Sequence, residues 1–157
     1  MDGWSWPEKK LEAADKHSRD WACAKVPAAR SAGIRPWPAS VRHGGSSGWS
    51  VVPLAGSDNG LGNLSIWKQR VAPGGATPPH RHDCEGVVLV SAGWGERHLD
   101  GQVRRFGPDT TLVVPRNAPH QIINTGDVPL EPTGIFANAP VAVFFPDGQP
   151  IELPWHS

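Results

Sequence analysis

Apolar and polar positions alternate in short runs along the chain from Trp49 onward. Alternation with a period of two is typical of a β-strand that buries one of its faces. Over residues 64–71 it separates a face that carries Trp67 and Gln69 from a face that carries charged side chains, so the first is expected to point inward. The uninterrupted apolar run Val87–Val90 instead predicts a strand that is buried on both faces.

Turn residues separate these runs, because the 18 glycines and 17 prolines are spread along the chain rather than gathered in one segment. Asp100-Gly101 lies between two such runs and is the strongest hairpin signal in the chain. Many short strands joined by turns predict an all-β sandwich or barrel. Further strands are expected near residues 49–54, 110–114, 120–124, 135–136, 141–145 and 151–153.

Residues 1–47 lack this regular pattern and are interpreted as an irregular, partly helical N-terminal extension rather than a separate domain. Ser5-Trp6-Pro7-Glu8 resembles a helix start, which predicts a helix from Glu8 to about Lys25. The barrel is then expected to comprise residues 48–157.

The composition argues against several classes of partner. Lys and Arg together number 15, as do Asp and Glu, so the formal charge is zero and neither nucleic acid nor an anionic membrane is expected to bind. No apolar run reaches the roughly 18 residues of a membrane helix. Two cysteines and an N-terminus without a secretory apolar core indicate a cytoplasmic protein without a disulfide framework.

Candidate metal ligands occur at two places in the chain. His80 and His82 are one residue apart, so on a strand both side chains point to the same face. His120 lies far downstream in a similar setting, just after a proline-rich turn. Converging imidazoles are typical ligands of a divalent metal ion. The alternative, ordinary barrel histidines without a metal, is less favourable because three buried, uncompensated imidazoles are costly.

Two motifs in order resemble those of the cupin superfamily. Gly74 or Gly75 opens the first motif, His80 and His82 provide its histidine pair, and Gly93 closes it. The second motif is represented by Pro115, His120 and Asn124 at matching spacing, with Asn117 and Asp109 in place of its two usual glycines. The resemblance covers about residues 60–145. It implies a double-sheet jelly-roll barrel, that is, a double-stranded β-helix, with the three histidines inside it around one divalent metal ion.

The chain departs from the first motif at the metal-binding glutamate. The motif's spacing puts this residue at Gly86, whereas the nearest carboxylate is Glu85, one place earlier. On a regular strand Glu85 points away from the histidines, although a bulge after His82 would turn it inward. The expected site therefore has either three histidines or three histidines with Glu85 as fourth ligand. The three-histidine type resembles the acetylacetone-cleaving dioxygenase and cysteine dioxygenase.

Three further side chains are candidates for catalysis or substrate binding. Glu85 is a candidate base or ligand, or a solvated loop carboxylate. Gln69 is the polar candidate in the cavity, beside Trp67, whose alternative role is core packing. Arg97 falls on the face that is inward in the resembled fold and is a candidate for holding a substrate carboxylate, or else lies at the rim. Cys84 is interpreted as a small buried residue rather than a reactive thiol.

The resemblance implies a metal-dependent enzyme, with a non-haem iron dioxygenase favoured. Its substrate would be small and bound through two oxygens, as in a β-diketone, an α-hydroxyketone or a catechol, with O₂ as co-substrate. Fe(II) is favoured over Zn, Ni or Mn. The alternatives are a non-redox isomerase, cyclase or lyase and a non-catalytic binding module. An apolar substrate cavity is expected to be lined by Val88, Val90, Ile122 and Phe144.

Four tryptophans lie in the first 47 residues, and exposed tryptophans are commonly covered in an interface. A homodimer that uses this N-terminal region is therefore expected. The four residues are Trp4, Trp6, Trp21 and Trp37.

Overall fold

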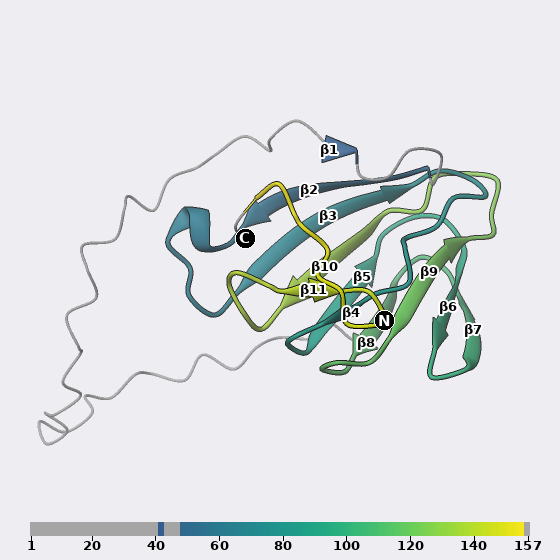
Figure 1. The fold of residues 1–157 in the computed structure, drawn as a ribbon. Coiled ribbons are helices and arrows are strands. Elements are labelled where there is room, and N and C mark those ends of the chain that lie inside the picture. The colour runs from purple at the N-terminus through teal and green to yellow at the C-terminus, as the bar shows by residue number, and fades with distance from the viewer. Residues whose placement is uncertain (1–40, 43–47, 156–157) are drawn as a thin grey trace, which may run out of the picture.

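The computed structural model describes residues 41–42 and 48–155 of the chain, and Figure 1 shows their arrangement. Within these residues the fold is built from strands and one short 3-10 turn, η2 (Ser57–Asn59), which confirms the predicted all-β class. The predicted helix over residues 8–25 lies outside the described residues. The strands are β1 (Val41–Arg42), β2 (Trp49–Ala55), β3 (Ser65–Val71), β4 (Arg81–His82), β5 (Gly86–Val90), β6 (Gly95–Leu99), β7 (Gln102–Phe106), β8 (Thr110–Val114), β9 (His120–Asn124), β10 (Pro132–Phe136) and β11 (Val143–Phe144).

The strands form two layers of antiparallel sheet. One sheet has the order β1-β2-β3-β10-β5-β8 (Figure 1). The other layer consists of β7-β6-β9 and β11-β4, which are joined by isolated bridges from His80 to His120 and from Ala76 to Ile123. Non-consecutive strands are neighbours in both layers, as in the jelly-roll barrel that the sequence predicts.

The inner face is set by alternation along the strands. On β3 the buried residues are Ser65, Trp67, Gln69 and Val71, so the predicted inward face is confirmed. The prediction that Val87–Val90 is buried on both faces is wrong, since Leu89 is 42% exposed. β5 lies inside an antiparallel sheet whose outer face stays open to solvent, so only alternate residues on it enter the core.

The turns between strands use the residues that their backbone geometry requires. Asp100 and Gly101 both have positive φ angles, 49° and 73°, and connect β6 to β7 as the predicted hairpin. Asn117 and Asp109, which replace glycines of the resembled motif, have φ angles of 60° and 59°. Asn and Asp tolerate this left-handed region better than other residues that carry a Cβ, so both substitutions preserve the turns.

The chain end folds differently from the prediction. Residues 141–145 contain only the two-residue strand β11, and residues 151–153 form no strand. Ile151 is nevertheless fixed against the barrel, because its backbone N–H donates to the carbonyl oxygen of Val143 at 2.8 Å. This segment returns across the barrel, so its apolar side chains are available to close one end of it. Among the described residues no helix is long and apolar enough to cross a membrane.

Candidate metal centre

The pairing of two distant segments brings the three histidines together. The backbone N–H of His80 donates to the carbonyl oxygen of His120 at 3.0 Å, and the N–H of His120 donates back to His80 at 2.8 Å. Residues that face each other in this way project their side chains from the same side of the sheet. His82 is on that side as well, because it lies two residues beyond His80. One ligand atom from each histidine lies within 4.8 Å of the others.

The hydrogen bonds of the rings decide which nitrogens can bind a metal. Nδ1 of His80 lies 2.7 Å from the carbonyl oxygen of Pro78, and Nδ1 of His120 lies 2.9 Å from that of Ala118. A carbonyl only accepts, so each Nδ1 carries the proton and each Nε2 keeps its lone pair for a metal. His82 differs, since its Nδ1 is buried without a hydrogen-bond partner among the described residues.

Burial keeps the three imidazoles neutral. Desolvation and the nearby His120 lower the pKa of His80 from 6.5 to about 3. Desolvation, with His80 and His120 close by, also holds the pKa of His82 well below its usual value. The pKa of His120 is lowered mainly by burial, and the Arg97 charge adds to the effect. A neutral imidazole is the form that ligates a metal, so these residues fit a divalent ion at neutral pH.

The predicted fourth ligand is not part of this cluster. Glu85 is exposed and lines a separate pocket together with Asp83, Cys84 and Arg116. The position where the resembled motif carries its glutamate is Gly86, which pairs with Phe136 and Val114, both buried. The structure therefore corresponds to the three-histidine alternative, because no bulge turns Glu85 inward.

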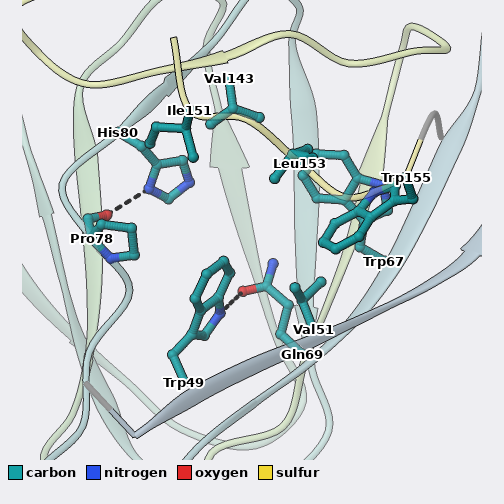
Figure 2. Close-up of a pocket in the computed structure, with 10 residues that line it drawn as sticks. All are labelled: Trp49, Val51, Trp67, Gln69, Pro78, His80, Val143, Ile151, Leu153 and Trp155. Carbon is teal, nitrogen blue, oxygen red and sulfur yellow. Dashed lines mark hydrogen bonds between the residues drawn. The ribbon is translucent and has the colours of Figure 1, made fainter. Parts of the chain in front are cut away.

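An aromatic cavity opens beside His80 (Figure 2). Its volume is about 20 Å³, which is the room that one ordered water molecule requires. Gln69 lies at its floor and accepts a hydrogen bond at Oε1 from Trp49 Nε1 at 3.0 Å (Figure 2). An indole N–H only donates, so Oε1 is the acceptor and the amide nitrogen of Gln69 is left facing the cavity. The lining residues are Trp49, Val51, Trp67, Gln69, Pro78, His80, Val143, Ile151, Leu153 and Trp155.

The apolar lining predicted from the sequence is wrong. Val88, Val90 and Ile122 belong to a closed core cluster with Leu112 and Leu130, because they lie deeper between the two sheets. Phe144 points away from the cavity, since its ring lies 4.7 Å from the guanidinium carbon of Arg81. Its neighbour Val143 faces the cavity instead, as alternation along β11 requires.

Among the lining residues that sequence reasoning missed are Trp49, Ile151, Leu153 and Trp155. They come from the two ends of the described chain, where no motif marks them. The only signal was compositional, because eight tryptophans in 157 residues is an unusually high number.

Two other candidates have defined places outside this cavity. Arg97 pairs with Ile122 between β6 and β9, and its Nη1 donates to the carbonyl oxygen of Val113 at 2.9 Å. Cys84 is buried, and burial beside Asp83 raises the pKa of its thiol to about 11, which agrees with a packing role. The predicted catalytic roles of Glu85, Gln69 and Arg97 stay predictions.

Comparison with known proteins gives the same fold. Residues 67–135 match the family model described as Cupin domain. An auxin-binding protein of Nicotiana tabacum is 36% identical over 115 residues, which cover 66% of this chain and 62% of that protein. Auxin-binding protein 1 of Arabidopsis thaliana is 36% identical over 110 residues, covering 64% of this chain and 56% of that protein. The chain thus spans about six tenths of the length of these relatives.

Two solved structures also resemble the chain. A Cupin 2 conserved barrel domain protein from Salinispora arenicola has a TM-score of 0.58 and 21% identity, over 69% of this chain and 90% of that one. The polyketide cyclase RemF from Streptomyces resistomycificus has a TM-score of 0.56 and 22% identity, over 74% of this chain and 80% of that one. At such identities the likeness concerns the fold alone.

Proposed function

Residues 67–135 form a domain of the cupin superfamily, and we propose that this domain binds a small organic anion through a divalent metal ion. The observation that carries this proposal is the cluster of three neutral imidazoles, of which one, His80, also lines the aromatic cavity. His80, His82 and His120 would hold the metal. A metal held by three uncharged ligands keeps its double positive charge and open coordination positions, so it favours an anionic oxygen ligand.

The polar side chain in the cavity supports an oxygen-bearing ligand. Trp49 fixes the amide of Gln69, and the structure gives the Gln69 nitrogen no hydrogen-bond partner among the described residues. This N–H₂ group can donate to an oxygen of a ligand beside His80. The donor is held in place before binding, so little side-chain freedom is lost when the ligand arrives.

The rest of the lining supports an aromatic or apolar body on the ligand. Trp49, Trp67 and Trp155 surround the cavity, and the rings of Trp67 and Trp155 lie edge to face at 6.0 Å. The relatives are named as auxin-binding proteins, and auxins are small aromatic carboxylic acids. Since the cavity now accommodates about one water molecule, binding requires Leu153 or Trp155 to move aside.

Metal content and ligand binding test this function together. We expect close to one metal ion per chain in wild type by inductively coupled plasma mass spectrometry, and a loss of metal in His80→Ala/His120→Ala. His98→Ala is the control, because His98 lies on the hairpin outside the cluster. Titration calorimetry with indole-3-acetate should give binding to the metal-loaded protein and none after chelation. Equal binding with and without metal would contradict the proposal.

Dioxygenation by Fe(II) is the second candidate function. No carboxylate lines the described cavity, so a Lewis-acid isomerase or lyase would lack a general base there. Oxygen chemistry at a three-histidine iron centre relies on open metal positions and does not require a carboxylate base in the cavity. Uptake of O₂ with a β-diketone by the Fe(II)-loaded protein would support this activity. Substrate binding without O₂ uptake by the Fe(II)-loaded protein would contradict dioxygenation.

A further inference from the structure

His82 is held in a different way from the other two histidines. The rings of His80 and His120 are each fixed by a hydrogen bond from Nδ1 to a backbone carbonyl. His82 Nδ1 has no such partner. Metal-binding histidines almost always gain their orientation from an outer hydrogen bond, so another interaction must fix this ring.

Aromatic packing provides that interaction. The ring of Phe136 lies 4.5 Å from the His82 ring, centre to centre, with an angle of 61° between their planes. The ring of Trp67 packs against that of Phe136, with 4.6 Å between the ring centres, and lies farther from the His82 ring, at 6.0 Å. Phe136 is therefore the nearest aromatic support of this imidazole, and it is 1% exposed.

Two glycines make room for the Phe136 ring on the inner face of the sheet. A Cβ at Gly134 would lie 2.6 Å from Cε2 of the ring, and a Cβ at Gly86 would lie 2.6 Å from its Cδ1. Real Cβ atoms essentially never come this close to another atom. Gly86 is also the place where the resembled motif carries its glutamate, so the ring lies where the stem of that side chain would begin.

We propose that Phe136 is the positioning residue for His82. Its ring fixes the His82 imidazole by packing, whereas the imidazoles of His80 and His120 are fixed by hydrogen bonds. The inference rests on the proposed metal centre. Its consequence is that removal of the ring loosens one ligand of three without removing a donor atom. Metal affinity then falls although all three histidines are present.

A pair of matched variants tests this role. Phe136→Leu removes the ring beside His82, whereas Phe106→Leu removes a buried ring from the other core cluster. Both should lower the melting temperature. Only Phe136→Leu should weaken Co(II) binding, by at least about 10-fold in competition with a chelating dye, and alter the Co(II) absorption bands. Equal weakening in both variants, or unchanged affinity in Phe136→Leu, would overturn the proposal.

A metal-free readout separates this inference from the proposed function. Nitrogen-detected NMR of the imidazoles in the metal-free protein should show a changed tautomer ratio or exchange broadening at His82 in Phe136→Leu, while His80 stays as in wild type. An unchanged His82 spectrum would overturn the positioning role even if wild type binds metal. Failure of wild type to bind any metal would overturn the proposed function and leave the NMR comparison as the deciding test.

Discussion

At the scale of single residues, the neutral state of the three histidines determines what the site can bind. Burial, rather than a specific partner, is the largest cause of the lowered pKa values of His80, His82 and His120. The same desolvation that prepares the imidazoles for a metal makes their protonation in the fold unfavourable. Binding competence and acid sensitivity therefore have one physical origin.

We expect the metal-free protein to lose stability on acidification below about pH 6.5. The pKa of His80 is about 3 in the folded protein and 6.5 in the unfolded chain. Between pH 3 and pH 6.5 the unfolded chain therefore binds more protons than the folded protein. Each histidine that stays neutral in the fold then lowers the free energy of unfolding by about 1.4 kcal/mol per pH unit. Thermal melts in chelator from pH 8 to pH 5 measure this slope. His80→Asn should reduce the slope, because it removes one of the buried imidazoles.

We expect Glu85→Gln to bind metal as tightly as wild type, because Glu85 is exposed and lies outside the histidine cluster. His120→Gln removes an imidazole from the cluster and should lose at least about 10-fold in affinity. Competition with a chelating dye measures both. A weakened Glu85→Gln variant would show that this carboxylate contributes to the metal centre.

At the scale of elements, turns and alternation place the strands, and two-residue periodicity decides which side chains reach the interior. The hairpin between β6 and β7 sets the register that opposes Leu99 to Gln102 and Arg97 to Arg104. β9 pairs with the other edge of β6, which places Leu99 opposite His120. A local turn thus contributes to the position of His120, one of the three candidate metal ligands.

We expect Gly101→Ala to destabilise the protein by about 1 kcal/mol, because residue 101 has a positive φ angle that disfavours any Cβ. Gly62→Ala is the matched control. Neither glycine has an atom within 4 Å of an added Cβ, and only Gly101 has a left-handed φ angle. Urea denaturation of the two variants separates backbone strain from crowding. An equal loss of stability in Gly101→Ala and Gly62→Ala would contradict the view that the positive φ angle at residue 101 causes the destabilisation.

At the scale of the whole molecule, the two ends of the described chain meet at the cavity. Trp49 begins β2, whereas Leu153 and Trp155 lie in the irregular C-terminal segment. A segment that has no strand of its own thus lines one side of this small cavity. If the cavity binds the proposed ligand, we expect this segment to limit the ligand's size.

We expect Leu153→Ala to raise the affinity for indole-3-acetate relative to the affinity for the smaller benzoate. The reason is that the shorter side chain widens the cavity where the C-terminal segment lines it. Glu152→Ala is the control, since the neighbouring Glu152 is exposed and does not line the cavity. Titration calorimetry on the metal-loaded proteins gives the ratio of affinities. An unchanged ratio in Leu153→Ala would show that the segment does not limit ligand size.

The expected homodimer stays a prediction at this scale. Light scattering coupled to size exclusion should give a mass near twice the 16.9 kDa of one chain. Deletion of residues 1–40 should shift the mass towards one chain if the N-terminal tryptophans form the interface. A monomeric full-length chain would contradict the prediction.

The sequence by itself determined the features that depend on neighbours in the chain. The alternation on β3, the Asp100-Gly101 hairpin and the shared face of His80 and His82 follow from local backbone geometry, and all three were predicted correctly. The spacing of two motifs also indicated His120. Such features need only the rules that relate one residue to the next few.

Only the tertiary structure decided the features that depend on contacts between distant segments. It left Glu85 outside, placed Phe136 over two glycines beside His82, and closed the cavity with Trp49 and Trp155 rather than with Phe144. Packing at these places depends on which segments cross and how deeply each side chain lies between the sheets. Alternation gives the face on which a residue lies but not its depth or its neighbour, so this information appears only when the chain has closed into the barrel.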